Sequence, residues 1–375
     1  MQTGLSSPMS NTKIYVAEKI FTGNEMLHGY AVVVNDDIIS RLIPQEEIRN
    51  NTAIVDYKNA LIAPAFIDIQ IYGANKRLLS AYPDATTVKA IYEYSEAGGC
   101  CACMPTVATH TYETIFKCID AVKDYRDGGG EGVLGLHVEG PWINKAKRGA
   151  HNAEWVFSPT VQQATELLEY GKDVIKMITL APEVCSKEIV ELVHSYNIVV
   201  SAGHTDATYD QATASFNSIK TATHLYNAMS ALQHREPGMV GAIFDHASVY
   251  CSIVPDGYHV SFPAIRIAKK IMGERLFAIT DAVTETQEGY YTHALDGDKY
   301  AANGILSGSA LTMVKCVKNF VEYCDIDIEE ALRMCSLYPA SVIHKENELG
   351  ILAEGREANM VVLSDALNVL ETINK

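Results

Sequence analysis

The sequence has a shortage of positive charge. Its 30 lysine and arginine residues face 46 aspartate and glutamate residues, which gives a formal net charge of −16 at pH 7. Nucleic-acid binding needs a basic surface that neutralises phosphate groups, so this balance argues against a nucleic-acid partner. It also means that an anionic substrate must be drawn into a local cationic pocket against the field of the whole molecule.

Long apolar runs are also missing. No segment approaches the roughly 20 apolar residues that a membrane-spanning helix needs. The opening residues MQTGLSSPMSNTK contain no apolar stretch of the kind found in signal peptides. Nine cysteines make an odd number, and without a secretory signal we expect no disulfide framework. These absences predict a cytosolic, cytoplasmic protein without a membrane partner.

Three of the cysteines, Cys100, Cys101 and Cys103, lie close together in the stretch GGCCACMPT. They suggest a thiolate metal site, but neighbouring side chains of a strand point to opposite faces, so they do not easily share an ion. A free cysteine packs as a small hydrophobic residue. We therefore interpret this stretch as a buried strand.

The composition is that of a folded protein with a large core. Hydrophobic residues make up 48% of the 375 residues and charged residues 20%, a balance that argues against disorder. From about residue 63 onward, short apolar runs alternate with amphipathic stretches, which is typical of parallel strands joined by helices. Eight such units predict an α/β fold, a (β/α)8 TIM-type barrel. The expected strands span residues 65–72, 101–108, 133–140, 174–182, 198–204, 221–228, 249–256 and 276–282.

Helices are expected between these strands. The clearest amphipathic segments span residues 87–98, 112–125, 160–171 and 186–196. Their apolar residues recur with the spacing of one helix face. Residues 326–344 predict one more helix followed by a connector.

The two ends of the chain have a different pattern. Residues 12–62 and 348–375 contain short alternating strands separated by turns, and we expect one small β-sandwich domain built from both termini. Such a pairing is reasonable because the entropy cost of closing a loop grows slowly with its length. The predicted domains are residues 1–62 and 346–375, which form the two parts of the small domain, and residues 63–345, which form the barrel.

Polar residues gather at the ends of the predicted barrel strands, where the chemistry of such barrels is found. The third strand ends with Glu139, the fifth ends with His204, the sixth carries His224, and the eighth ends with Asp281. Buried carboxylates and imidazoles are costly unless they pair or bind a metal. One carboxylate and two imidazoles are ligands of an open catalytic zinc site. Asp281 is then free to act as general base and general acid.

Several short motifs carry a family resemblance. GLHVEGPW, RGAHN, SAGHTDA, THLYNAM, REPG, DGYHV, ITDA and LSGSALTM follow one another in the chain. From about Pro64 to the LYPA segment near residue 340, the chain is similar to the N-acetylglucosamine-6-phosphate deacetylase family of the amidohydrolase superfamily. This resemblance implies hydrolysis of the acetamido group of N-acetyl-D-glucosamine 6-phosphate, which gives D-glucosamine 6-phosphate and acetate.

The resemblance also implies roles for individual residues. Glu139, His204 and His224 match the ligands of one divalent metal ion, for which Zn²⁺ is expected first and Fe²⁺, Co²⁺ and Mn²⁺ are alternatives. Asp281 matches the catalytic acid and base, and His151 matches a residue that polarises the substrate carbonyl. The implied reaction is attack by a water that the metal activates.

Other positions match residues that line the substrate. Arg235 and His259 are expected to contact the phosphate and nearby hydroxyls, because a guanidinium recognises phosphate through paired hydrogen bonds. In the family the counterpart of Arg235 reaches across a dimer interface, which implies a homodimer. The expected substrate contacts are Gln70, Ala150, Asn227, Ala228, Arg235, Asp256, His259, Leu306, Ser307 and Gly308.

The first barrel strand lacks a feature that many metal-dependent hydrolases have. They end this strand with His-x-His and hold a metal ion there, whereas this chain has Gln70 and Tyr72 at the two positions and no His-x-His anywhere. The family resemblance includes members with glutamine at the first position. We therefore expect one ion per chain and a Gln70 amide that hydrogen-bonds the site without ligating. Tyr72 and the following ANKRLLS depart from the family pattern.

Other features of the sequence are weaker. GGGEG at residues 128–132 precedes a strand instead of opening a helix, so we interpret it as a turn and not as a phosphate loop. LSGSALTM offers hydroxyls but no GxSxG elbow for a serine nucleophile. Seven histidines in loops or helix-like segments are interpreted as structural or surface residues: His28, His110, His194, His234, His246, His293 and His344.

Two other functions stay open from the sequence. The first is an amidohydrolase that acts on a different amide, such as another acetylated amino-sugar phosphate or a cyclic amide, and the altered segment after Tyr72 leaves room for it. The second is a non-catalytic protein that binds sugar phosphates. It predicts loss of the metal ligands or of Asp281, and all of these residues are present.

Overall fold

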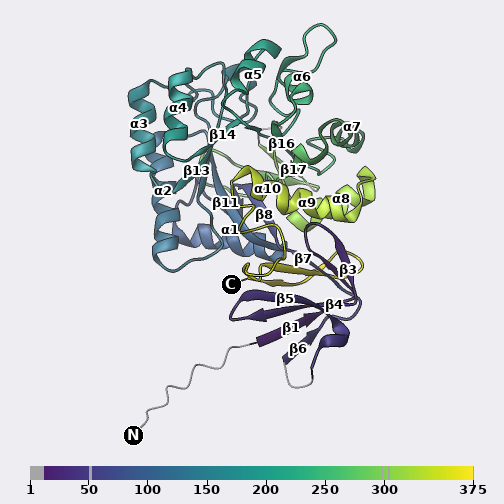
Figure 1. Cartoon of the computed structure of the whole chain (residues 1–375). Helices are drawn as coiled ribbons and strands as arrows, with labels where there is room; N and C mark the ends of the chain where they lie inside the picture. Colours follow the sequence, from purple (N-terminus) through teal and green to yellow (C-terminus); the bar gives the residue numbers. More distant parts are fainter. Residues whose placement is uncertain (1–11, 50–52, 298, 303–304, 375) are drawn as a thin grey trace.

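The structure is a computed structural model, and it describes residues 12–49, 53–297, 299–302 and 305–374. A barrel surrounded by helices lies beside a smaller unit of β-strands (Figure 1). The eight barrel strands are parallel and follow chain order around the sheet. They are β8 (Phe66–Ile71), β11 (Cys100–Ala108), β12 (Leu136–Glu139), β13 (Ile175–Leu180), β14 (Val199–Ala202), β15 (Thr221–Ala222), β16 (Tyr250–Ile253) and β17 (Leu276–Ala278).

The sheet closes where its first and last strands meet. Ile71 at the end of β8 forms a parallel bridge with Ala282, which follows β17. The backbone N–H of Asp281 donates to the Gln70 carbonyl at 3.0 Å, and the N–H of Tyr72 donates to the Ala282 carbonyl at 2.9 Å. These contacts confirm the predicted (β/α)8 barrel. They also bring Gln70, Tyr72 and Asp281 together at its carboxyl end.

Seven of the eight barrel strands are shorter than the sequence pattern predicts, most clearly the sixth, whereas β11 begins one residue earlier than predicted. The predicted strand 221–228 is extended only at Thr221–Ala222. His224, Tyr226 and Ala228 have positive φ angles of 43°, 75° and 50°, and this left-handed backbone is incompatible with an extended strand. The rest of the segment is therefore a loop at the rim of the barrel.

The first four long helices lie close to the predicted segments. Asp84, Thr111, Thr160 and Ser186 cap them by accepting a hydrogen bond from a backbone N–H of the first turn, a donor that the helix leaves free. The α-helices are α1 (Ala85–Ala97), α2 (Tyr112–Asp127), α3 (Val161–Tyr170), α4 (Lys187–Ser195), α5 (Tyr209–Ser215), α6 (Gly238–Asp245), α7 (Phe262–Met272), α8 (Met313–Cys324), α9 (Ile328–Cys335) and α10 (Leu337–Val342). Short 3-10 helices span Gln45–Glu47, Lys145–Lys147 and Gly273–Arg275.

The connector predicted after α9 is wrong, because that segment is helical. α10 begins directly after Ser336 and contains Pro339 as its third residue. Proline is tolerated in the first turn of a helix, where its missing N–H would have had no partner. Burial of Tyr338, Ala340 and Val342 against the barrel then stabilises the helix.

The smaller unit combines strands from both ends of the chain, as predicted. β21 pairs with β7, which places Val362 beside Ile62. Ile20, Val32, Ile62 and Val362 belong to one buried cluster between two sheets. One sheet contains β5 (Ile38–Pro44), β4 (Tyr30–Asn35), β1 (Thr12–Val16) and β6 (Ala53–Asp56) in that order. The other contains β22 (Val369–Ile373), β21 (Met360–Leu363), β7 (Leu61–Pro64), β2 (Lys19–Phe21) and β3 (Met26–His28).

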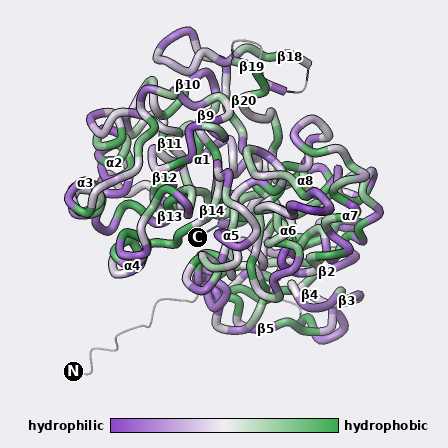
Figure 2. The backbone as a smooth tube through the Cα atoms, turned by 90° about the horizontal axis from the view of Figure 1, so that it is seen from above, coloured by the Kyte–Doolittle hydropathy of each residue, from purple (hydrophilic) through white to green (hydrophobic). Residues whose placement is uncertain are grey.

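Two small antiparallel sheets extend the carboxyl end of the barrel. β9 (Gly73–Ala74) and β10 (Arg77–Leu78) follow the first barrel strand. β18 (Ala294–Asp296), β19 (Lys299–Ala302) and β20 (Ile305–Ser309) follow the last. Ser309 forms a bridge with Ala282, so β20 is fixed next to the end of β17. Figure 2 shows these three strands grouped at one edge of the molecule.

All nine cysteines are buried and free, as the packing interpretation predicts. Cys100, Cys101 and Cys103 lie in β11, the second strand of the barrel wall. Among the described residues, no helix has both the length and the apolar character needed to cross a membrane. The predicted limits between the small domain and the barrel, at residues 62–63 and 345–346, remain predictions.

Candidate active site

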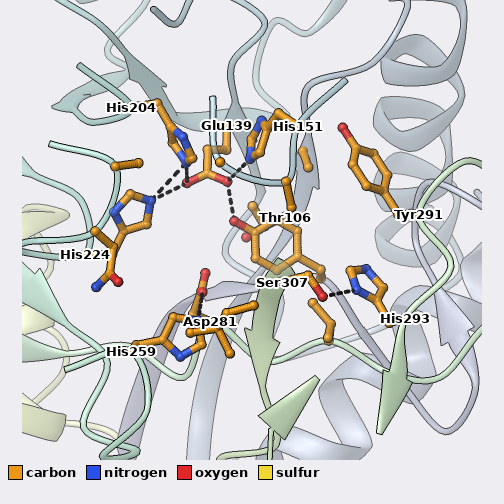
Figure 3. A pocket seen from close by; sticks show the side chains of 18 of the residues that line it. Thr106, Glu139, His151, His204, His224, His259, Asp281, Tyr291, His293 and Ser307 are labelled. Atoms are coloured by element: carbon orange, nitrogen blue, oxygen red, sulfur yellow. Dashed lines mark hydrogen bonds and ion pairs between the residues drawn. The ribbon is translucent and has the colours of Figure 1, made fainter. Parts of the chain in front are cut away.

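Three predicted metal ligands converge at the carboxyl end of the barrel (Figure 3). Glu139 ends β12, and His204 and His224 follow β14 and β15. The Glu139 Oε1 atom lies 3.4 Å from His204 Nε2 and 3.2 Å from His224 Nε2. The two Nε2 atoms lie 3.0 Å apart. All three side chains are buried, so their ligand atoms face one another with little competition from solvent.

The spacing of these atoms fits a tetrahedral metal site. Zinc–ligand bonds of about 2.0–2.1 Å place neighbouring ligand atoms about 3.3 Å apart, close to the three separations in this cluster. His204 Nδ1 donates to the Lys147 carbonyl at 2.9 Å, which leaves the lone pair of Nε2 to face the cluster. His224 Nδ1 is buried and has no hydrogen-bond partner among the described residues. Glu139, His204 and His224 therefore form a set of ligands that suits a divalent ion.

The second oxygen of Glu139 faces two further donors. The Tyr72 hydroxyl donates to Oε2, and His151 Nε2 lies 3.2 Å from the same atom. Burial alone would raise the pKa of the Glu139 carboxyl, but His204, His151 and His224 hold that pKa well below its usual range. The group is therefore a carboxylate, which is the form that ligates metals.

Gln70 links the two carboxylates of the site. Its Nε2 atom donates to Glu139 Oε1 and to Asp281 Oδ1, both at 3.0 Å, and lies 2.7 Å from the Tyr72 hydroxyl. The two side chains that replace His-x-His therefore bond to Glu139 instead of offering imidazole nitrogens. The hydrogen bonds of Gln70 are those expected from the sequence, and its absence from the metal ligands stays a prediction.

Asp281 lies next to the three predicted metal ligands (Figure 3) and has a raised pKa. Burial raises the pKa of its carboxyl to about 6, although His259 and His224 act in the opposite direction. A group whose pKa lies near neutrality serves well both as a base and as an acid. Its Oδ2 atom, which Gln70 does not contact, lies 3.7 Å from His259 Nε2.

His259 is held in place by Asp256. Asp256 Oδ2 accepts a hydrogen bond from His259 Nδ1 at 2.6 Å. Its Oδ1 atom accepts from the backbone N–H groups of Tyr258 at 2.8 Å and of His259 at 2.7 Å. These bonds direct His259 Nε2 toward Asp281 and the cavity, as Figure 3 shows.

The backbone turns sharply at three of these residues. His204, His224 and Asp281 have φ angles of 48°, 43° and 53°, the left-handed region that side chains other than glycine rarely adopt. Each residue follows a barrel strand, so the turn directs its side chain over the end of the barrel. Backbone conformations of this cost cluster at functional sites, where the surrounding structure holds them in place.

A cavity opens above these groups, and several predicted substrate contacts line it. Ala150, Asn227, Ala228, His259, Leu306 and Ser307 are among its lining residues. Gln70, Asp256 and Gly308 do not line the cavity. Gln70 and Asp256 each hydrogen-bond a residue that does, Asp281 and His259 respectively. Arg235 is exposed on the loop between β15 and α6, away from the lining. No lysine or arginine of the described chain lines the cavity.

The cavity wall also contains residues that the sequence interpretation missed. His293, interpreted as structural or surface, lines the cavity, and its Nδ1 atom lies 2.8 Å from the Ser307 hydroxyl. Tyr72, Thr106 and Tyr291 line it as well. His293 and Tyr291 precede β18 and lie outside every barrel strand, so the rule that points to strand ends could not find them. Thr106 lies within β11 and is an ordinary strand residue in sequence terms.

Comparison with known proteins agrees with the family resemblance. A family model described as amidohydrolase family matches residues 61–375. A second model, described as NagA composite domain, matches residues 16–62. Together the two matches cover nearly the whole chain.

Individual relatives are similar over almost their full length. An N-acetylglucosamine-6-phosphate deacetylase of Haemophilus influenzae is 34% identical over 366 residues, which cover 94% of this chain and 96% of the relative. An N-acetylgalactosamine-6-phosphate deacetylase of Escherichia coli is 29% identical over 373 residues, with 96% and 97% covered. The crystal structure of N-acetylglucosamine-6-phosphate deacetylase from Pasteurella multocida superposes with a TM-score of 0.92 at 32% identity, covering 96% of this chain and 98% of that one.

Proposed function

The chain belongs to the amidohydrolase family, and we propose that it removes the N-acetyl group of N-acetyl-D-glucosamine 6-phosphate. The products are D-glucosamine 6-phosphate and acetate. The observation that carries this proposal is the buried cluster of Glu139, His204 and His224 with Asp281 beside it. The substrate is suggested by relatives named for it that align over nearly the whole chain.

One divalent ion per chain is proposed for this site, with Glu139, His204 and His224 as its ligands. Zinc is proposed first because one carboxylate and two imidazoles, with a position left open, are a usual set for catalytic zinc. Such an ion, when bound, polarises a carbonyl and lowers the pKa of a water to about 7. Gln70 and Tyr72 support a single ion, because they offer Glu139 hydrogen bonds where related hydrolases have histidines.

Asp281 acts as the base and then as the acid. It takes a proton from the water that attacks the acetyl carbon, and it later gives this proton to the departing amine, which is otherwise a very poor leaving group. Gln70 donates to Oδ1, so Oδ2 is the oxygen available for the proton. His259 beside Oδ2 favours the charged form of Asp281, which is the form that accepts the proton from the water.

His151 stabilises the negative charge that develops on the acetyl oxygen. Burial lowers the pKa of its imidazole to about 4, so the ring is neutral at pH 7 and acts as a hydrogen-bond donor. A donor fixed in place before the reaction costs little reorganisation, and such groups make a large contribution to catalysis. Asn227, Ala228, Ala150, Leu306 and Ser307 are proposed to hold the sugar in the cavity above.

Binding of the phosphate is proposed to need a second subunit. The cavity of one chain has no cationic lining among the described residues, yet a phosphate in a protein with a charge of −16 needs a local cation. Arg235 is exposed outside the cavity of its own chain. A homodimer in which Arg235 reaches the partner's cavity would supply a paired guanidinium contact. A cytosolic location is also proposed, since all nine cysteines are free.

Acetate release tests this proposal directly. The substrates to compare are N-acetylglucosamine 6-phosphate, the same sugar without phosphate, and N-acetylgalactosamine 6-phosphate. We expect the fastest release from the first and little from the unphosphorylated sugar. Faster release from N-acetylgalactosamine 6-phosphate would identify that sugar phosphate as the preferred substrate. No release from any of the three, with metal present in the protein, would overturn the proposal.

A further inference from the structure

Thr109 lies beneath the imidazole of His151 and is completely buried. It follows the last residue of β11, the strand that runs beside β12 and Glu139. The Thr109 hydroxyl lies 2.7 Å from His151 Nδ1, and the Thr109 backbone N–H donates to the same nitrogen at 3.4 Å. Two groups of one residue therefore face one nitrogen of the ring.

These contacts determine which nitrogen of His151 carries the proton. The backbone N–H can only donate, so Nδ1 must present its lone pair. The hydroxyl then donates to Nδ1 at 2.7 Å in preference to the Glu139 carbonyl, which lies 3.4 Å away. On the other side of the ring, Nε2 lies 3.2 Å from Glu139 Oε2, and a carboxylate oxygen can only accept. The proton therefore resides on Nε2, the nitrogen that faces the site.

Thr109 is itself held in place by Tyr291, and Gly140 leaves room for its side chain. The Tyr291 hydroxyl donates to the Thr109 carbonyl at 2.6 Å, which ties the segment before β18 to this point. The same phenol oxygen accepts from the backbone N–H of Asn152, next to His151, at 3.4 Å. Gly140 leaves the space that the threonine hydroxyl occupies, because a Cβ atom there would lie only 2.2 Å from Thr109 Oγ1.

We propose that Thr109 is a positioning residue that fixes His151 in the tautomer with its proton on Nε2. The inference rests on the proposed function, in which this N–H is offered to the acetyl oxygen. The tautomer of a histidine is set by the hydrogen bond that its other nitrogen makes. Without the threonine hydroxyl, Nδ1 keeps only the long bond from the backbone, and a larger fraction of the rings takes the unproductive tautomer or orientation.

The first test compares Thr109→Val with Thr109→Ser in the metal-loaded enzyme. Valine removes the hydroxyl at nearly constant volume, and the expected result is a fall in kcat of about tenfold, the loss of roughly one hydrogen bond in the transition state. KM should stay within about twofold, because the contact acts on the transition state and not on substrate binding. Serine should restore most of kcat. A normal kcat in Thr109→Val would overturn the inference.

A matched control separates this effect from the general loss of a buried hydroxyl. Thr22 is buried in the smaller unit, and its hydroxyl donates to the Glu25 carbonyl at 3.2 Å. Thr22→Val should lower thermal stability without changing kcat. Isotope-edited nitrogen NMR of the His151 ring, assigned with a His151 variant, should show the Nε2–H tautomer in the wild type and a mixture in Thr109→Val. An unchanged ring signal would contradict the inference.

A double-mutant cycle decides whether Thr109 acts through His151. In a His151→Ala background, Thr109→Val or Thr109→Ala should cost no further activity, because the ring they position is gone. Equal losses in both backgrounds would show a general structural role and overturn the inference. Full activity of His151→Ala would instead overturn the role of His151 in the proposed function, and this inference with it. If His151→Ala were impaired but Thr109→Val had normal activity, the inference would be overturned and the proposed role of His151 would stand.

Discussion

At the scale of single residues, the two carboxylates of the site, Glu139 and Asp281, each direct their two oxygens to different neighbouring side chains. Glu139 Oε1 faces His204 and His224, while Oε2 faces Tyr72 and His151. Asp281 Oδ1 accepts a hydrogen bond from Gln70, and Oδ2 lies beside His259. This division keeps the proposed metal ligands apart from the proposed proton acceptor, because no oxygen of Asp281 belongs to the cluster of Glu139, His204 and His224.

The role of Asp281 predicts a large loss in Asp281→Asn. The amide still accepts the bond from Gln70, so the shape of the site is kept while the proton acceptor is lost. We expect kcat for acetate release to fall by about 10²–10⁴-fold, with substrate affinity and metal content nearly unchanged. Calorimetric binding of the substrate serves as the control. Near-normal turnover in this variant would contradict the assigned role.

The contact between Tyr72 and Glu139 predicts weaker metal binding in Tyr72→Phe. The phenol holds one oxygen of the ligating carboxylate, and loss of such a supporting partner costs about 10–100-fold in metal affinity. Competition with a chelating dye would measure the change. Tyr170→Phe is the matched control, since its hydroxyl bonds to Asp120 at 2.9 Å on the surface. Equal metal affinity in both variants would refute the prediction.

The sequence predicts the three proposed metal ligands and Asp281 because each one ends or follows a barrel strand. Glu139, His204, His224 and Asp281 become neighbours as soon as the strands form one barrel. Contacts between other residues of the cavity region could not be found in this way. Thr109 and His151 are 42 residues apart in the chain, and His293 and Ser307 are 14 apart. Neither pair is linked by a strand-end pattern.

At the scale of helices and strands, alternation of hydrophobic residues predicts which elements exist but not where they end. All eight barrel strands are present, and α1 to α4 begin at side chains that cap them. The strands end early where His204, His224 and Asp281 take left-handed backbone. That conformation depends on the contacts around the site, which a local pattern does not contain.

The capping box of α3 predicts a local stability effect without a catalytic one. The Thr160 hydroxyl accepts from the Gln163 N–H, and the Gln163 side chain accepts from the Thr160 N–H. Thr160→Ala should lower the free energy of unfolding by about 1 kcal/mol, whereas Thr160→Ser should keep it. Urea unfolding measures the difference. A change in kcat without a change in stability would contradict this assignment.

At the scale of the whole molecule, strands from both ends of the chain form one unit beside the barrel (Figure 1). β21 pairs with β7 directly before the first barrel strand. The chain is strongly acidic and its cavity has no lysine or arginine among the described lining residues. Assembly with a second copy is therefore the proposed source of positive charge for the phosphate.

Arg235→Ala tests the proposed contact between Arg235 and the substrate phosphate. Loss of a charge-assisted contact to phosphate should raise KM for the phosphorylated sugar by roughly 10–100-fold, while slow turnover of the unphosphorylated sugar stays the same. Arg235→Lys should recover part of the affinity, because it keeps the charge but not the paired geometry. An unchanged KM in Arg235→Ala would refute the phosphate contact.

Mixing of variants shows whether Arg235 acts on its own site or on the partner's. A heterodimer of Arg235→Ala and Asp281→Asn subunits contains one complete site only if the arginine crosses the interface. We expect each heterodimer in the mixture to regain the low KM at one of its two sites. Mixtures that behave as the sum of the two separate variants would place Arg235 at the site of its own subunit.

One ion, held by Glu139, His204 and His224, is proposed to support deacetylation. Titration of metal-free protein with Zn²⁺, followed by acetate release from N-acetylglucosamine 6-phosphate, tests it most directly. The structure predicts no activity at the start, a linear rise, and a plateau at one equivalent per chain. A rise that continues to two equivalents, or full activity of the metal-free protein, would contradict the account.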